Sequence, residues 1–195
     1  LRIGGVASLN LDDFIDFEDH NHTKRLALRV IEKGDKERML PIPMELQLLI
    51  TAYLSHPYLQ EVERTTPTGA QVLWISTSNH MVPSWEYTGE ARRLSTRAID
   101  AMIKKYGEMA GIPPAQLHAH AMRHLFGTEL AEGDVDDVAR ADFMGHANVD
   151  TVKVYTHLAM KKKARLMDMA NPLGKIRTPV SGMLKKAPAL LSAQR

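Results

Sequence analysis

The 195-residue sequence contains no cysteine. Disulfides, thiolate catalysis and most structural zinc sites depend on the cysteine sulfur, so the sequence excludes all three. It also has no run of eighteen apolar residues, and without one no transmembrane helix is expected. Nothing in the first residues has the pattern of a signal peptide. We therefore expect a cytoplasmic protein that does not span a membrane.

A strong net charge is missing as well. The formal net charge is +2 and the pI is about 8.8, which alone does not indicate nucleic-acid binding. A basic surface must therefore come from local clusters of lysine and arginine. The candidate clusters are Lys24-Arg25-Arg29, Lys33-Lys36-Arg38, Arg92-Arg93-Arg97, Lys104-Lys105 and Lys161-Lys162-Lys163-Arg165, the last of them expected as a solvated face or a phosphate contact.

The first third of the sequence predicts a short helix and a basic β-hairpin. Apolar residues at 6, 9, 11 and 14 indicate a short helix that ends at Asn10 or Asp12. Residues 24–31 alternate between apolar and polar side chains, as in a half-buried strand. A tight turn at 33–36 leads to a returning strand over 38–42, whose proline is tolerated only at a sheet edge. The apolar, β-prone segment 72–76 is the predicted third strand of a small sheet.

The remaining segments predict helices. Pro43 starts one that ends before His56, and Ser95 caps an amphipathic helix that ends near Gly111. The apolar face expected to point inward in that helix comprises Ile99, Met102, Ile103, Tyr106 and Met109. Later helices are expected to end at Gly133-Asp134, which also caps the next helix, at Gly145 and at Asn171-Pro172, with Asp150 or Thr151 capping the helix that carries Tyr155.

The residues best suited to chemistry lie between His118 and His157. His120, Arg123 and His124 fall on one side of their predicted helix, because residues three and four apart are neighbours on a helix surface. A tyrosine nucleophile, an arginine for an anionic oxygen and histidines that move protons together suit phosphodiester chemistry.

Other interpretations of these residues stay open. The histidines could suggest a zinc site, but cysteine and a helical His-Glu-x-x-His pattern are both absent. Tyr155 could be a core residue, and Arg123 could form a structural ion pair with Glu129 or Asp136. Lysine at an exposed hairpin turn, such as Lys33, also discourages pairing between sheet edges.

Taken in order, Arg2, the Lys33 hairpin, His120-x-x-Arg123, Gly145-His146 and Tyr155 resemble the tyrosine recombinases, a family that includes phage integrases and Xer-type resolvases. The match covers nearly the whole chain. It implies an α+β fold, mainly α-helical with a small antiparallel three-stranded β-sheet. Residues 1–174 would then be the catalytic domain, and residues 175–195 a tail that can be exchanged between protomers.

The resemblance implies a site-specific recombinase that cuts and rejoins double-stranded DNA through a covalent 3′-phosphotyrosine. The phosphotyrosine keeps the bond energy, so no ATP, metal or other cofactor is implied. The implied roles are Tyr155 as nucleophile, Arg2 and Arg123 as the clamp of the pentavalent phosphate, His120 as proton acceptor, His146 as donor to a nonbridging oxygen and Lys33 as acid for the leaving 5′ oxygen. Candidate DNA contacts are Lys36, Arg38, Arg92, Arg93, Arg97 and Lys104.

The resemblance also raises expectations about assembly. Residues 183–191 could pass to a neighbouring protomer in a tetramer on DNA, in a nucleoid-associated enzyme. The sequence departs from the family at Gly5, where an acid is usual, and it begins at Leu1 without the family's N-terminal helical domain, so we expect a fragment or a processed product. A DNA-binding derivative that does not cut and a type IB topoisomerase are the alternatives. The recombinase mechanism requires Arg2 and Lys33 to reach Arg123 and Tyr155.

Overall fold

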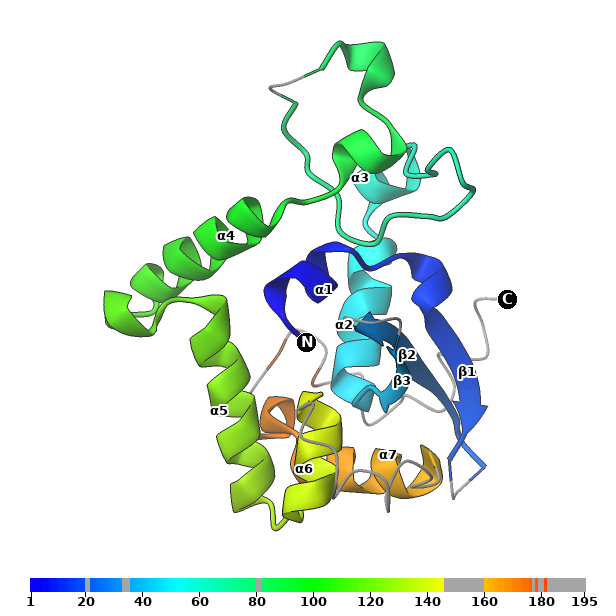
Figure 1. Ribbon diagram of the computed structural model, residues 1–195. Coiled ribbons are helices and arrows are strands. Elements are labelled where there is room, and N and C mark those ends of the chain that lie inside the picture. Colours follow the sequence, from blue (N-terminus) through cyan, green and yellow to red (C-terminus); the bar gives the residue numbers. More distant parts are fainter. Residues whose placement is uncertain are drawn as a thin grey trace. The chain divides into compact units, whose positions relative to one another are not determined.

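The computed structural model describes residues 1–19, 22–32, 36–79, 82–145, 160–176, 178 and 181 (Figure 1). The chain divides into two units, each built from two separate stretches of sequence. Unit 1 comprises Leu1–Asp13 and Val62–Phe126, and unit 2 comprises Phe14–Glu61 and Gly127–Arg195. The two stretches of each unit are far apart in sequence, so long-range packing holds each unit together.

Unit 1 combines helices with a core made of loops. Its elements are α1 (Ile3–Ala7), η1 (Leu11–Asp13), η2 (Ser84–Glu86), η3 (Gly89–Arg92), α4 (Thr96–Met109), η4 (Pro114–Gln116) and the first part of α5 (Ala119–Glu132). Helix α1 packs against α4. Val72 and Leu73 are fully buried, and the Leu73 N–H donates to the carbonyl of Leu9 over 3.0 Å. The stretch after the first helix is thereby fixed to the 72–75 segment.

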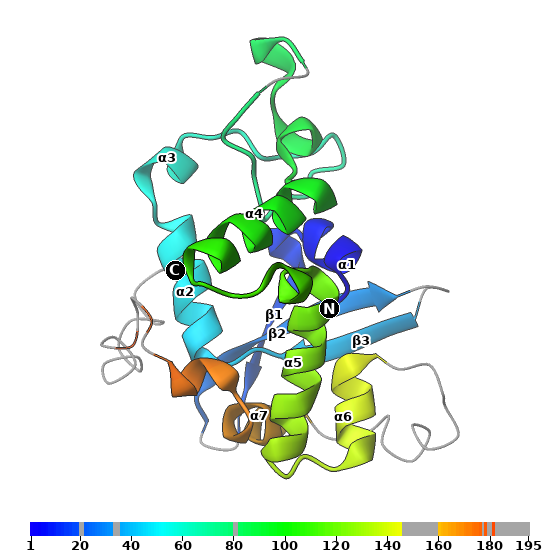
Figure 2. The same cartoon turned by 90° about the vertical axis from the view of Figure 1, so that its left-hand side faces the viewer.

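Unit 2 contains the sheet and the remaining helices. Its elements are β1 (Phe14–Glu18), β2 (Lys24–Glu32), β3 (Lys36–Pro41), α2 (Met44–Leu54), α3 (Pro57–Gln60), the rest of α5, α6 (Asp137–Met144), α7 (Met160–Met169) and η6 (Pro172–Lys175). Helix α7 packs against β3, and η6 packs against α2. Figure 2 shows α6 beside the second half of α5, where Met144 lies against Gly127.

The predicted hairpin is confirmed, but the predicted third strand is wrong. The sheet is antiparallel with the order β1-β2-β3, so Pro41 lies on an edge strand as expected. The third strand is Phe14–Glu18, which follows the predicted first helix, and that helix ends at Ala7, earlier than predicted. Segment 72–76 is buried without joining the sheet, and its residues form only single bridges, Val72 to Asn10 and Ile75 to Arg93. A short apolar run does not reveal its partner.

Several helix ends agree with the local signals in the sequence. The Ser95 hydroxyl accepts a hydrogen bond from the Ala98 N–H over 3.2 Å, and Gly145 ends α6 with a left-handed φ of 62°. The predicted cap at Asp134 is wrong, because this residue is in the turn with a φ of 54°. The Asp136 carboxylate caps α6 instead, by accepting from two backbone N–H groups of the first turn. The connection is thus two residues longer than predicted.

The apolar face of α4 is also less buried than predicted. Met102, Tyr106 and Met109 are 46%, 57% and 75% exposed. The close contact of this helix is made by Gly107, which is buried against Leu117. A glycine allows this approach because a side chain at this point would fill the space that Leu117 occupies.

Two helical glycines of unit 1 should respond oppositely to alanine. A Cβ at Gly5 has open space around it, so Gly5→Ala should raise the free energy of unfolding by about 0.5–1 kcal/mol through the lower backbone entropy of the unfolded chain. A Cβ at Gly107 would lie 2.0 Å from Leu117 Cδ2, so Gly107→Ala should lower it by about 1–3 kcal/mol. Urea denaturation measures both. An unchanged Gly107→Ala protein would contradict this packing.

Candidate functional site

Helix α5 presents the His120-x-x-Arg123 pair from its first turns. Its start is fixed by His118, whose Nδ1 accepts a hydrogen bond from the Ala121 N–H over 3.0 Å. His120 therefore follows the helix start directly and is exposed, while Arg123 lies one turn further and is half-buried. An exposed imidazole beside a partly desolvated guanidinium is an arrangement that can meet a phosphate, because charge-assisted hydrogen bonds strengthen as water is excluded.

His120 is paired with His124 one turn along the helix. The two Nε2 atoms are 2.7 Å apart, and the rings meet edge to face with centroids 4.2 Å apart. Such a hydrogen bond needs a proton on one nitrogen and a lone pair on the other, so at least one Nε2 is unprotonated. His124 can thus fix which nitrogen of His120 carries a proton.

Arg2 belongs to the same unit as this pair. It is the N-cap residue of α1, its side chain is exposed, and its carbonyl accepts from the Val6 N–H over 3.0 Å. No atom lies within 4 Å of the Cβ position at Gly5, where the resemblance leads to an acid. Crowding therefore does not explain the absence of a carboxylate at this position.

Three predicted catalytic residues, Lys33, His146 and Tyr155, lie outside the described residues. Their described neighbours belong to unit 2, where Lys36 begins β3 and Gly145 ends α6. The structure therefore describes Arg2, His120 and Arg123, and the approach of Lys33 and Tyr155 to them stays a prediction.

Arg93 was predicted to contact DNA, and in the structure its guanidinium binds groups within unit 1. Its Nη1 donates to the carbonyls of Ala7 and Leu9 over 3.1 and 3.0 Å, and its Nη2 donates to Asn10 Oδ1 over 2.8 Å. Its Nε pairs with Glu90 over 2.7 Å. All three nitrogens serve the fold by connecting the stretch after α1 to η3.

Arg38, another predicted DNA contact, also has an internal role. Its Nη1 donates to the carbonyls of Asp142 and Phe143 over 2.6 and 3.0 Å, at the end of α6. A cation is favourable there because the last carbonyls of a helix carry partial negative charge. This nitrogen of Arg38 is therefore not available to a phosphate.

The other predicted DNA contacts of unit 1 stay candidates. Arg97 is exposed in the first turn of α4. Lys104 is also exposed, and its hydrogen bond to the Asp100 carboxylate, 2.7 Å long, raises the pKa of the lysine. Arg92 stacks over the ring of Tyr87, with its guanidinium carbon 4.2 Å from the ring centroid. Among these residues, Arg97 and Lys104 on α4 are exposed, so a phosphate can reach them from solvent.

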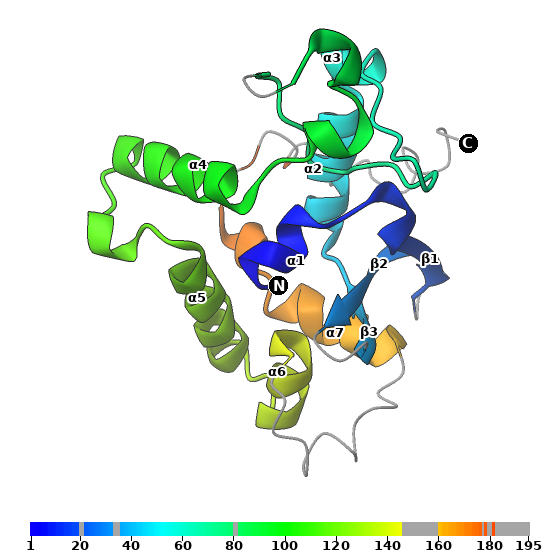
Figure 3. The same ribbon diagram turned by 45° about the horizontal axis from the view of Figure 1, so that its top comes forward.

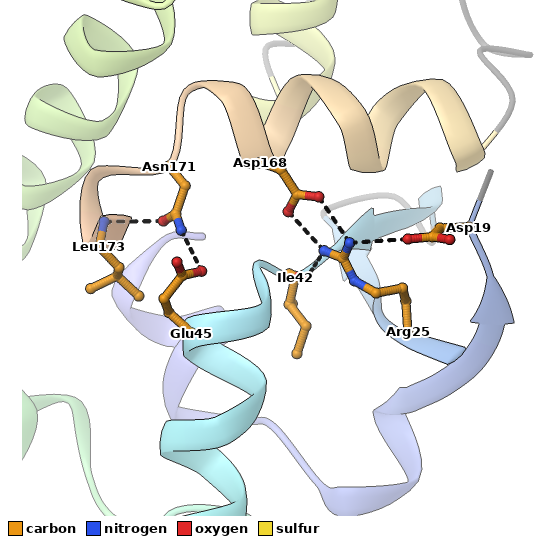
Figure 4. Close-up of polar contacts among 7 residues, drawn as sticks. All are labelled: Asp19, Arg25, Ile42, Glu45, Asp168, Asn171 and Leu173. Atoms are coloured by element: carbon orange, nitrogen blue, oxygen red, sulfur yellow. Dashed lines mark hydrogen bonds and ion pairs between the residues drawn. The ribbon is translucent and has the colours of Figure 1, made fainter. Parts of the chain in front are cut away.

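Two charged clusters of unit 2 were missed by the sequence reasoning. Arg25, grouped with the basic surface, is only 4% exposed and pairs with both oxygens of Asp168 over 2.8 Å (Figure 4). That hydrogen-bonded pairing raises the pKa of Arg25. Lys163, expected on a solvated face, is likewise buried and pairs with Asp142 over 2.6 Å. Only the folded chain brings these partners together, so no local pattern indicates them.

The comparisons decide the family. The model of the phage integrase family matches residues 1–162. The chain belongs to the phage integrase family. Tyrosine recombinase XerC of Chlamydia muridarum is 31% identical over 172 residues, which make up 88% of this chain and 47% of that protein. XerC of Proteus mirabilis is 30% identical over 175 residues, or 90% of this chain and 49% of that protein. The chain spans about half the length of these relatives.

A solved structure with a similar fold confirms the fold class. The XerH site-specific recombinase, in a post-cleavage complex with a palindromic difH substrate, superposes with a TM-score of 0.56. It is 20% identical, and the match covers 88% of this chain and 41% of that one. The expected α+β fold, mainly helical with a small antiparallel sheet, is therefore confirmed. Within the described residues, no helix has the length and apolar character needed to span a membrane.

The contrast between Arg93 and Arg97 gives a test of these assignments. Arg93→Ala leaves the carbonyl of Ala7 without its arginine donor and removes one of two donors to the carbonyl of Leu9, which keeps the Leu73 N–H. It should lower the free energy of unfolding by about 1–3 kcal/mol. Arg97→Ala, at an exposed site, should change it by no more than about 0.5 kcal/mol. It should weaken DNA binding and, if it removes one phosphate contact, reduce the slope of log K against log salt by about 0.9.

Urea denaturation and DNA titrations at several salt concentrations measure both effects. A stable Arg93→Ala protein with weakened DNA binding would reinstate Arg93 as a DNA contact.

Proposed function

We propose that this chain is the catalytic part of a tyrosine-type site-specific recombinase, which cuts and rejoins double-stranded DNA through a 3′-phosphotyrosine at Tyr155. The observation that carries the proposal is the surface of α5, where exposed His120 and half-buried Arg123 stand one turn apart. Membership of the phage integrase family and the XerC relatives support it.

The charge of the reacting phosphate explains the choice of residues. Negative charge increases on the nonbridging oxygens as the pentavalent species forms, and guanidinium groups aimed at those oxygens stabilise it. Arg123 and Arg2 serve this purpose, with His146 as a further donor. Loss of one such preorganised donor raises the barrier by roughly 3 kcal/mol.

Proton transfer is the other requirement. The hydroxyl of Tyr155 must lose its proton to become nucleophilic, because a phenol with an ordinary pKa near 10 is protonated at neutral pH. His120 takes this proton, and the hydrogen bond between His120 and His124 sets which His120 nitrogen is free to accept it. The leaving 5′ oxygen takes a proton from Lys33. No ATP or metal enters this scheme, because the phosphotyrosine conserves the energy of the broken bond.

A covalent-trapping experiment tests the proposal. A nicked DNA substrate loses the fragment that carries the 5′ hydroxyl after cleavage, so the wild-type chain should accumulate an SDS-resistant adduct. Tyr155→Phe should abolish the adduct and retain DNA binding, since only the nucleophilic oxygen is removed. Tyr106→Phe is the matched control, because Tyr106 is an exposed tyrosine on α4 and its loss should leave adduct formation unchanged.

The outcomes separate the alternative functions. DNA binding without an adduct over a broad library of nicked sites would favour a DNA-binding derivative that does not cut. Relaxation of supercoiled DNA without any two-site product would favour a type IB topoisomerase.

Assembly into a tetramer by exchange of the C-terminal tail belongs to the same proposal. The apolar residues over 183–191 that motivate it lie outside the described residues. A truncation after Ser181 tests it and keeps the pair between Lys175 and Glu129 in unit 2. We expect recombination to fall much more than DNA binding, because the tail would couple neighbouring active sites. Normal recombination by the truncated chain would refute tail exchange.

A further inference from the structure

A buried ion pair joins the end of α6 to the start of α7. Lys163 Nζ lies 2.6 Å from Asp142 Oδ2, and the two side chains are only 9% and 13% exposed. The chain between these helices carries His146 and Tyr155. The ion pair therefore fixes the two ends from which the proposed nucleophile is presented.

Both charges of this pair oppose the dipole of their own helix. Asp142 lies in the last turn of α6, where the backbone carbonyls are already partly negative, and Lys163 lies in the first turn of α7, where the N–H groups are partly positive. Each helix alone would be more stable with a residue of the opposite charge at that end. The arrangement is favourable only because the two ends are brought together.

Arg38 adds a third element to the pair. From β3 its Nη1 reaches the carbonyls of Asp142 and Phe143, and α7 itself packs against β3 (Figure 3). The strand begins at Lys36, three residues after Lys33. The cluster therefore lies within a few residues, in sequence, of the two stretches that carry Lys33, His146 and Tyr155.

We propose that Asp142, Lys163 and Arg38 form a helix-end clamp that positions Tyr155 for attack on the phosphate. The three residues are positioning residues, since they act through the segment whose ends they hold. Fixed ends reduce the number of conformations that the segment can adopt. A displacement of about 1 Å at a reacting atom can slow a reaction by roughly 100-fold. The inference rests on the proposed function and deepens it.

The clamp is tested by the rate of adduct formation at saturating DNA. Lys163→Met keeps much of the buried aliphatic side chain and removes the charge. We expect adduct formation to slow by about 10- to 100-fold, with DNA affinity unchanged within about 2-fold, because the buried Lys163 is not placed to contact DNA. A wild-type rate in Lys163→Met would overturn the clamp.

Reversal of the pair separates positioning from a direct role of Lys163 in binding or chemistry. The double variant Asp142→Lys with Lys163→Asp restores opposite charges, and each charge now suits the dipole of its helix end. We expect this variant to recover most of the rate that either single variant loses. Failure to recover, in a folded protein with normal DNA affinity, would show that Lys163 acts directly on the substrate.

Two matched variants on α7 complete the experiment. Met169→Ala truncates an exposed side chain of the same helix and should leave the rate unchanged; an equal slowing would assign the effect to a general disturbance of α7 and overturn the clamp. Asp168→Asn weakens the Arg25 pair at the far end of α7, so it should lower the melting temperature without slowing adduct formation in the folded protein. Equal slowing of adduct formation in Asp168→Asn would show that the rate depends on the stability of α7 and not on the clamp.

The clamp and the proposed function fail in different ways. A wild-type chain that forms no adduct overturns both. A wild-type adduct with an unchanged Lys163→Met rate overturns the clamp alone. A double-mutant cycle of melting temperatures for Asp142→Asn and Lys163→Met reports on the pair without activity, and additive effects would show that the two residues do not interact.

Discussion

The buried guanidinium of Arg25 is the interaction on which unit 2 most depends. A buried charge is tolerated only when its donors are paired, and here Asp168, Asp19 and the carbonyl of Ile42 all accept from it (Figure 4). These partners come from α7, from the residue after β1 and from the connection between β3 and α2. One side chain from the central strand β2 thus fixes the sheet to α7.

Helix α7 is consequently held at both of its ends. Lys163 joins its first turn to α6, and Asp168 joins its last turn to Arg25 on the sheet. Asn171, just beyond the helix, donates to Glu45 on α2 over 2.7 Å. Successive contacts along α7 therefore fix this helix to α6, to the sheet and to α2.

Local signals predicted the elements whose cause is local. The β-hairpin, α2, and the caps at Ser95 and Gly145 each depend on residues within one turn or one strand, and the order of His120 and Arg123 on α5 follows from helical periodicity. The contacts that the sequence did not indicate join residues that are far apart in the chain. Arg93 donates to Ala7, 86 residues away, and Arg38 donates to Asp142, 104 residues away. In a sequence, an arginine that binds a distant carbonyl is indistinguishable from one that binds DNA phosphate.

The same difficulty applies to the clusters of basic residues in the sequence. Arg25, Arg38, Arg93 and Lys163 all bind acceptors inside their own units, and three of them neutralise a carboxylate there. Because each of these three ion pairs has no net charge, the formal net charge of +2 is that of the remaining charged residues. Under the proposed function, phosphate contacts would come from exposed cations such as Arg97, while the internal cations shape the fold. A variant in one group need then not perturb the other.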